Sequence, residues 1–198
     1  MNIQIKRLSP ELINDYLDYF DNVAFTDNKE WADCYCVHYH MNDKLEAEQK
    51  EYTASGGKCF GRELAIKLIK AGALQGYLAY SDGSVVGWCN TNDRGSFDRL
   101  RKENRPELWE KVDCTEKAKL IVCYSIAPNM RRKGIATELL GRVCKDASEE
   151  GYTYVEAYPG KAKSNIQRNY HGPYSLYEKC GFTLYKDLND ESIVRKYF

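Results

Sequence analysis

The stretch Leu120–Leu140, LIVCYSIAPNMRRKGIATELL, decides the fold of this chain. Its first half is an apolar run rich in β-branched residues, which is typical of a buried strand and ends at Pro128. A basic turn follows, and after Gly134 the apolar residues recur at helical spacing. A strand that leads through a small-residue turn into a helix N-terminus is an arrangement that binds phosphate, because the first amides of a helix are free.

The composition is that of a folded, soluble protein. The chain has 198 residues, of which 43% are hydrophobic and 29% charged, so it is long enough to bury a core. Lysine plus arginine equals aspartate plus glutamate, at 29 each. Because no net charge attracts nucleic acid or an anionic membrane, we expect neither as a partner, and any phosphate recognition must be local.

The sequence favours a cytoplasmic location. The N-terminus MNIQIKRLSPELI has no apolar signal region, and no apolar run is long enough to span a membrane. The eight cysteines are scattered, and several lie inside apolar runs, where the thiol packs as a small hydrophobic group. We therefore expect mostly reduced thiols rather than a disulfide framework.

The pattern of the whole chain predicts an α/β fold. Strands are expected over 3–6, 75–80, 85–91, 119–127, 152–158, 182–185 and 193–197, and helices over 10–20, 42–52, 61–71, 133–150 and 173–180. The Asp82-Gly83 pair between two of these strands predicts a hairpin. The segment 119–158 is long enough for a βαβ crossover, so its two strands should be parallel within a sheet of mixed direction.

Two segments carry the chemistry. The first is Arg131-Arg132-Lys133-Gly134-Ile135-Ala136, where free amides, the helix dipole and three cations would attract a diphosphate to a backbone with small side chains. The alternative is a solvated helix start, since the segment lacks the Gly-Lys-Ser/Thr ending of a P-loop.

The second segment is Tyr174–Phe182. If Gly181 ends this helix in a Schellman motif, Phe182 packs against Tyr177 and fixes its side chain, as a proton donor requires. The alternative is that Tyr177 is only the aromatic part of a hydrophobic cap.

Together, the two segments resemble the GCN5-related N-acetyltransferase (GNAT) superfamily. Its first motif is Arg/Gln-x-x-Gly-x-Gly/Ala after a strand, and its second is Leu-Tyr-x-x-x-Gly-Phe. The matching positions are Arg131, Gly134 and Ala136 in the first motif and Leu176, Tyr177, Gly181 and Phe182 in the second. One strand-length segment separates the two helices, and the resemblance covers about 76–187.

The resemblance implies a fold and an activity. The fold would be a mixed, mostly antiparallel sheet with a central parallel βαβ crossover and helices on both faces. Residues 1–198 would form a single domain, in which 1–75 shape the acceptor pocket and 76–187 bind acetyl-CoA. The activity would be acetyl transfer from acetyl-CoA to a primary amine by direct attack, in a possible homodimer. Independently of the resemblance, the long loop 159–172 and the aromatic segment 31–40 suggest an enclosed pocket, so we expect a small-molecule acceptor, and we expect no metal.

The resemblance also implies roles for single residues. The backbone of Ile126 and Ala127 would pair with the pantetheine arm, and the amides of Arg131–Ala136 would hold the pyrophosphate. Tyr177 would protonate the departing thiolate as general acid.

The segment before the Tyr177 helix departs from the family pattern. Asn165 or Asn169 could make the usual asparagine contact to pantetheine. Lys161, Lys163 and Arg168 either meet the 3′-phosphate of CoA or belong to a solvated basic loop.

The base that deprotonates the amine has two candidates. Glu156 shares one face of the strand 152–158 with three tyrosines, so it either points into the cleft as the base or is a carboxylate hydrogen-bonded to those tyrosines. His171, near the start of the Tyr177 helix, is the second candidate, and a loop or capping histidine is its alternative.

The segment Trp31–His40 carries Cys34, Cys36, His38 and His40, which suggests a metal site. On a strand the outer two would lie roughly 20 Å apart at ~3.3 Å per residue, and a second pair of ligands is not visible. A better interpretation is an aromatic, thiol-lined wall of the acceptor pocket; simple core packing is the alternative. A CoA-binding module without catalysis and a thiol- or metal-responsive regulator remain competing functions.

Overall fold

The computed structural model describes residues 2–110, 115–161 and 166–198. Its strands are β1 Ile3–Arg7, β2 Gly76–Ser81, β3 Ser84–Asp93, β4 Ala118–Ile126, β5 Tyr154–Ala157, β6 Thr183–Asp187 and β7 Ser192–Tyr197. Its α-helices are α1 Ile13–Asn22, α2 Asp43–Ala54, α3 Phe60–Lys70, α4 Ile135–Glu149 and α5 Tyr174–Lys179. The elements follow the expected order. The helix expected from residue 10 begins instead at Ile13, after a 3₁₀ turn over Pro10–Leu12.

The described strands form one seven-stranded sheet in the order β1-β2-β3-β4-β5-β7-β6. Among the described strands only β4 and β5 pair in parallel, and α4 makes the crossover between them, so the expected mixed sheet is confirmed. The predicted hairpin is also present. Asp82 (φ 50°) and Gly83 (φ 81°) both adopt left-handed conformations in its turn, which match the twist of paired strands.

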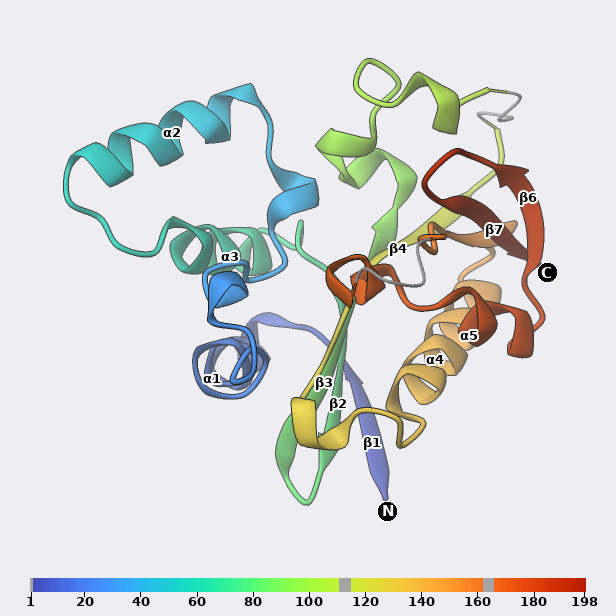
Figure 1. The fold of residues 1–198 in the computed structure, drawn as a ribbon, viewed down its shortest axis with the longest axis horizontal. Coiled ribbons are helices and arrows are strands. Elements are labelled where there is room, and N and C mark those ends of the chain that lie inside the picture. Colours follow the sequence, from blue (N-terminus) through green and yellow to red (C-terminus); the bar gives the residue numbers. More distant parts are fainter. Residues whose placement is uncertain (1, 111–114, 162–165) are drawn as a thin grey trace.

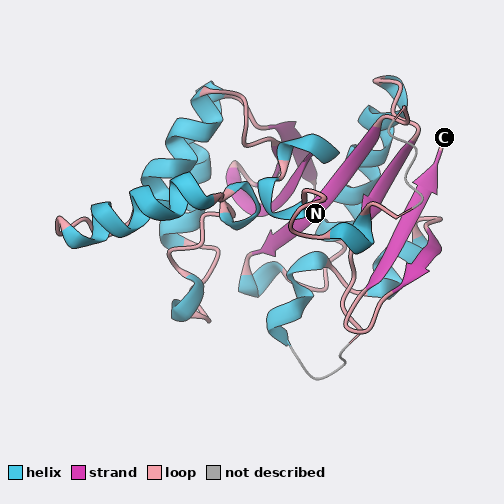
Figure 2. Cartoon of the chain, turned by 90° about the horizontal axis from the view of Figure 1, so that it is seen from above, coloured by secondary structure: helices cyan, strands magenta, loops and turns pink. Residues whose placement is uncertain are grey.

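Helices cover both faces of the sheet (Figures 1 and 2). On one face, α1 and α3 pack aromatic and aliphatic side chains against Trp88. On the other, the predicted apolar stripe of α4 is fully buried, and each such Leu or Val contributes about 1.5–3 kcal/mol. None of the described helices is long and apolar enough to cross a membrane.

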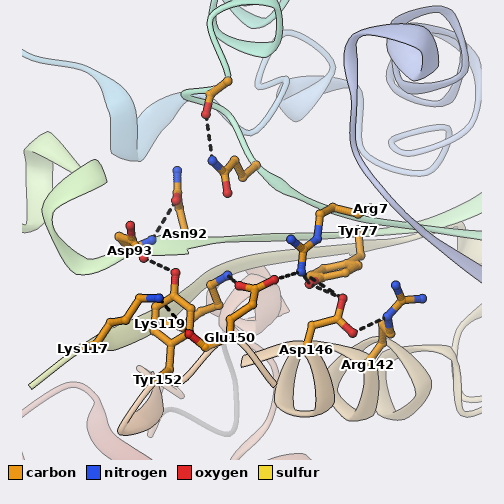
Figure 3. Close-up of polar contacts among 12 residues, drawn as sticks. Arg7, Tyr77, Asn92, Asp93, Lys117, Lys119, Arg142, Asp146, Glu150 and Tyr152 are labelled. Carbon is orange, nitrogen blue, oxygen red and sulfur yellow. Dashed lines mark hydrogen bonds and ion pairs between the residues drawn. The ribbon is translucent and has the colours of Figure 1, made fainter. Parts of the chain in front are cut away.

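A polar network attaches the C-terminal half of α4 to the sheet (Figure 3). Asp146 accepts hydrogen bonds from Arg7 of β1 (3.0 Å), Tyr77 of β2 (2.9 Å) and Arg142 (2.7 Å). Burial alone would raise the pKa of Asp146, but the bonds from Arg142 and Tyr77 outweigh it and lower the pKa. Glu150 extends the network to Lys119 of β4 (3.1 Å). Because one end of α4 is held in this way, its N-terminus is fixed beside the end of β4.

β4 and β5 separate part-way along β4. Their paired positions run from Ala118↔Tyr154 to Ile121↔Ala157, whereas β4 stays paired with β3 up to Ile126. Within the described residues, no strand pairs with Val122–Ile126 on the β5 side. The sheet therefore offers an unpaired backbone edge that ends next to the N-terminus of α4.

Candidate functional site

The turn from β4 into α4 has the geometry of an anion-binding site. Arg132 (φ 64°) and Gly134 (φ 86°) are left-handed, and α4 begins at Ile135. Across the described residues, none of the amides from Arg131 to Ala136 donates a hydrogen bond to another backbone group. Consecutive free amides at a helix N-terminus, together with the helix dipole, form a concave site for phosphate oxygens.

The space around this turn is open. A Cβ atom added to Gly134 would meet no other atom within 4 Å. Arg132 and Lys133 are exposed, and their cationic groups lie on the surface beside the free amides. A diphosphate group therefore fits both the room and the charge that these residues supply.

Arg131 contributes its amide but directs its side chain elsewhere. Its guanidinium pairs with Asp27 (2.5 and 3.1 Å) and donates to the carbonyl of Ile126 (3.2 Å). The hydrogen bonds from Arg131 lower the pKa of Asp27. The side chain thus ties the loop after α1 to the end of β4 rather than extending toward solvent.

The backbone groups of Ile126 and Ala127 differ in availability. The N–H of Ala127 donates to the carbonyl of Val86 (3.0 Å), and its carbonyl accepts from Met130 (2.8 Å). Both backbone groups of Ala127 therefore already make one hydrogen bond each within the chain, although a carbonyl oxygen can accept a second. Neighbouring residues of a strand direct their backbone groups to opposite edges, so those of Ile126 and Tyr124 face the unpaired edge, where the Ile126 carbonyl also accepts from Arg131.

Tyr177 is held by the predicted Schellman motif. The amide of Phe182 donates to the carbonyl of Tyr177 (3.0 Å), that of Gly181 donates to Glu178 (3.1 Å), and Gly181 has φ 82°. The rings of Tyr177 and Phe182 meet edge-on with centroids 5.2 Å apart. The cap therefore fixes the orientation of the Tyr177 ring.

The hydroxyl of Tyr177 is buried and donates to the main-chain carbonyl of His171. Burial, with the nearby Cys89 adding to it, raises the pKa of Tyr177 well above its ordinary value, so the phenol is neutral at pH 7. Gly172 passes close to the ring, since an added Cβ would lie 3.3 Å from the phenol oxygen. The arrangement preserves a protonated phenol beneath the segment Ile166–His171.

Glu156 does not face an open cleft, contrary to the expectation. Its side chain is 0% exposed. One carboxylate oxygen accepts from Arg94 (2.7 Å) and Tyr158 (2.6 Å), and the other accepts from Arg195 (2.6 Å). Both oxygens of this carboxylate are thus bonded to cationic guanidinium donors inside the fold, with a charge-assisted hydrogen bond on each side.

The asparagine and basic residues that were candidates for contacts to CoA are only partly described by the structure. Asn165 and Lys163 lie outside the described residues, and so does the side chain of Arg168. Asn169 is exposed, and its main-chain carbonyl accepts from Gly172 (2.9 Å). Lys161 is ion-paired with Asp187 (2.6 Å).

The segment Trp31–His40 lines a cavity of about 330 Å³. The cavity reaches β4 at Cys123–Ser125, which lies within the unpaired edge Val122–Ile126. Its other lining residues are Phe20 of α1, Phe25 and Glu30 from the segment that follows α1, and Tyr170. The interpretation of this segment as a pocket wall thus agrees with its position.

An unusual backbone turn places the thiols in this wall. Tyr35 (φ 39°) and Cys36 (φ 51°) are both left-handed, which costs about 1–2 kcal/mol for each non-glycine residue. The turn is anchored by hydrogen bonds from Tyr16 to the carbonyl of Tyr35 (2.6 Å) and from Asn90 to that of Cys36 (2.9 Å). Buried strain at a cavity wall is typical of positions that serve function.

The four candidate metal ligands of this segment do not lie together. His40 is buried against Phe97, with ring centroids 5.2 Å apart, and burial lowers its pKa to about 4. Cys34, Cys36 and His38 line the cavity instead. Among the described residues, no group of three or more His, Cys, Asp or Glu side chains is placed to hold a metal ion.

A second cavity, of about 660 Å³, adjoins the first at Tyr39 and Tyr170, which line both. The Tyr39 hydroxyl lies 3.0 Å from Nε2 of His171 and 3.3 Å from the Tyr170 hydroxyl. Tyr158 also contacts the His171 ring, with centroids 6.4 Å apart. The charged groups of this cavity are Arg105, Glu107, Asp187, Asp190 and Glu191. A hydrogen-bonded pair, Tyr39 and His171, thus connects an apolar cavity with a polar one.

Comparison with known proteins agrees with this geometry. A model of the acetyltransferase (GNAT) family matches residues 41–182. The chain belongs to the GNAT acetyltransferase family. Enzymes of this family use acetyl-CoA, and the free amides, the open space at Gly134 and the unpaired edge of β4 fit that co-substrate. Comparison with curated protein sequences gives no match.

Solved structures share the fold over the whole chain. The PaiA N-acetyltransferase of Thermoplasma acidophilum, in complex with coenzyme A, is 17% identical with a TM-score of 0.54. The polyamine N-acetyltransferase of Drosophila melanogaster is 10% identical (TM-score 0.55), and the mosquito arylalkylamine N-acetyltransferase-like 5b is 10% identical (TM-score 0.58). In each case 100% of both chains is covered.

Sequence reasoning missed several residues of the site. Arg94 and Arg195, which enclose Glu156, and Asp27, which holds Arg131, come from distant parts of the chain. Tyr39 was seen only as part of an aromatic segment. A usable signal existed for Glu156, because a carboxylate on a buried strand needs a cationic partner, although the sequence does not say which one.

Replacing Glu156 by glutamine should chiefly destabilise the fold of this GNAT chain. Loss of the charge leaves Arg94 and Arg195 buried and uncompensated, which costs about 3–5 kcal/mol of unfolding free energy. Urea denaturation measures the effect. The control is Glu149→Gln, whose partner Lys145 lies 4.0 Å away in an exposed pair worth at most about 1 kcal/mol. Wild-type stability with lost turnover in Glu156→Gln would contradict this and restore Glu156 as the base.

Replacing Gly134 by leucine should weaken CoA binding more than folding. The side chain would fill the open space at the free amides, and we expect the Kd for CoA to rise at least about tenfold, or ~1.4 kcal/mol. Gly151→Leu is the matched control, because Gly151 (φ 71°) ends the same helix, has equal room and carries the same backbone strain of about 1–2 kcal/mol. Calorimetric titration with CoA checks this, and equal affinities of the two variants would argue against the site.

Proposed function

We propose that this GNAT chain transfers an acetyl group from acetyl-CoA to the primary amine of a small molecule bound in the 330 Å³ cavity. The proposal rests on the fact that possible binding groups for acetyl-CoA follow one another along the chain and end at the cavity. Free amides at Arg131–Ala136 lead to the unpaired edge of β4, and that edge ends beside the cavity at Cys123–Ser125. The cavity is lined largely by residues from the first 75, in keeping with the expected role of that part of the chain.

The binding groups are mainly backbone groups. The amides of Arg131–Ala136 receive the pyrophosphate, with Arg132 and Lys133 adding positive charge. The backbone of Ile126 and Tyr124 pairs with the pantetheine amides in the manner of an added strand. Asn169, and Asn165 beyond the described residues, stay candidates for a further pantetheine contact.

Tyr177 serves as the general acid. Its raised pKa keeps the phenol protonated, and the cap directs the ring toward the segment that follows β5. During the transfer the hydroxyl proton passes from its bond with the His171 carbonyl to the leaving sulfur. Such proton donation is worth about 10²–10⁴ in rate.

Tyr39 and His171 remove the proton of the amine. An ammonium ion has no lone pair for attack, so a proton must leave before the new bond forms. Tyr39 lines both cavities, and in this proposal its oxygen accepts that proton while its own passes to Nε2 of His171. His171 lines the polar cavity, where acidic side chains stabilise the imidazolium that results.

A small acceptor is supported by the cavity volume of about 330 Å³, which is at the lower end of the range for small-molecule sites. Two structural relatives are named for small amines, a polyamine and an arylalkylamine. A macromolecular acceptor would need an open groove along the β4 edge instead.

Thiol release from acetyl-CoA, measured with a panel of primary amines, tests the function. Tyr177→Phe should lower kcat about 10²-fold or more while the Kd for CoA stays unchanged, because the hydroxyl acts on the leaving group. Loss of one hydrogen bond should cost only about 1 kcal/mol of stability. CoA binding without turnover of any amine by the wild type would support the alternative of a non-catalytic CoA-binding module.

The pH dependence tests the proton route. His171→Gln keeps the carbonyl that holds Tyr177 but removes the base, so we expect about a 10²-fold lower kcat at pH 7 that recovers at alkaline pH as more amine is unprotonated. Tyr39→Phe should behave alike. Tyr174→Phe, an exposed tyrosine on the same helix as Tyr177, is the control. A wild-type pH profile in both His171→Gln and Tyr39→Phe would refute the route.

A further inference from the structure

The apolar cavity carries information on the class of acceptor. Six aromatic side chains and three thiols line it. These are Phe20, Phe25, Trp31, Tyr39, Tyr124 and Tyr170, with Cys34, Cys36 and Cys123. Most groups in the wall thus offer carbon or sulfur rather than hydrogen-bonding atoms.

The aromatic side chains contact one another in a continuous series. Ring centroids lie 5.9 Å apart for Phe20 and Phe25, 6.3 Å for Phe25 and Trp31, and 5.8 Å for Trp31 and Tyr170. The last two contacts are edge-on. Such a series leaves ring faces and edges for a further flat ring, and each pair of that kind adds about 0.5–1.5 kcal/mol beyond burial.

The apolar cavity has few acidic side chains. Glu30 and Asp33 line it, and both residues are exposed at its opening. The other acidic side chains, Glu107, Asp187, Asp190 and Glu191, line the second cavity. Most of the acidic side chains that could pair with a polycationic acceptor therefore lie in the second cavity and not in the aromatic wall.

We propose that the acceptor is a primary amine joined through a short chain to an aromatic ring. The ring lies among Phe25, Trp31 and Tyr170, and the amine reaches β4 at Cys123–Ser125. The amine nitrogen bonds to the acetyl carbon, the thioester C–S bond breaks, one amine proton leaves, and the sulfur takes up a proton. This inference rests on the proposed function and names the acceptor class of the same site.

The experiment compares primary amines in the thiol-release assay. The aromatic members are 2-phenylethylamine and tryptamine, and the comparison members are hexylamine, which is apolar without a ring, and spermidine, which is polycationic. We expect kcat/KM to be at least about tenfold higher for the better aromatic amine than for either comparison amine, since tenfold is ~1.4 kcal/mol of differential contact.

A variant locates the effect in the wall. Trp31→Ala should raise the KM of the aromatic amine about tenfold and leave that of acetyl-CoA unchanged, whereas Trp31→Phe should restore most of the loss. Tyr52→Ala is the matched aromatic control, since Tyr52 packs against Phe60 (5.7 Å), away from the cavity. An unchanged aromatic KM in Trp31→Ala would overturn the placement of the ring.

The outcomes separate this inference from the proposed function. Efficient turnover of spermidine or hexylamine, with poor turnover of both aromatic amines, overturns the aromatic acceptor and leaves N-acetyl transfer intact. Thiol release with none of the amines, although CoA binds, overturns the proposed function itself. Preference for aromatic amines that Trp31→Ala abolishes supports both.

Discussion

The site depends on one buried carboxylate, that of Glu156, which lies where β4 and β5 begin to separate. The paired positions of these strands end at Ile121↔Ala157, one residue beyond Glu156. Arg94, next to the end of β3, and Arg195, on β7, bind its two oxygens at 2.7 and 2.6 Å. The ion pairs thus connect β5 and β7 to the end of β3 at the point where β4 and β5 stop pairing. Beyond this point the edge of β4 is unpaired, while the rest of the sheet stays connected. Glu156, which the sequence offers as a candidate base, is held here in ion pairs at the point where the parallel pairing ends.

An open strand edge inside a protein is costly unless something binds it. Backbone N–H and C=O groups that lose water without a partner cost free energy, so native proteins pair nearly all of them. In this chain the edge at Val122–Ile126 and the amides of Arg131–Ala136 lie consecutively along one path. A ligand with amides at one end and phosphates at the other would satisfy both sets of groups, which fits the proposal that the co-substrate is recognised mainly by backbone. In that proposal side-chain identity matters where room is required, as at Gly134, and where Arg132 and Lys133 add positive charge.

The sequence predicts those features of the site that depend on neighbouring residues, and it does not predict contacts between residues that are far apart in the chain. The turn at Gly134 and the cap at Gly181 are local, because a left-handed residue and a few neighbours define them, and both were predicted. The face of Glu156 was also predicted from strand alternation. Its surroundings were not, since Arg94 and Arg195 lie 62 and 39 residues away, and Asp27 lies 104 residues from Arg131. Tyr35 and Cys36 adopt left-handed conformations although neither is a glycine, so the residue types do not predict this turn.

His171 connects the two proton-transfer steps of the proposed reaction through different atoms. Its main-chain carbonyl accepts from Tyr177, and its imidazole bonds to Tyr39. A shift of this residue would therefore move the general acid and the base route together. Gly172 follows at φ 80°, and a Cβ added there would lie 3.3 Å from the Tyr177 hydroxyl, so a side chain at this position would crowd the phenol. In the proposed reaction, proton delivery to sulfur and proton removal from the amine thus both depend on the position of His171.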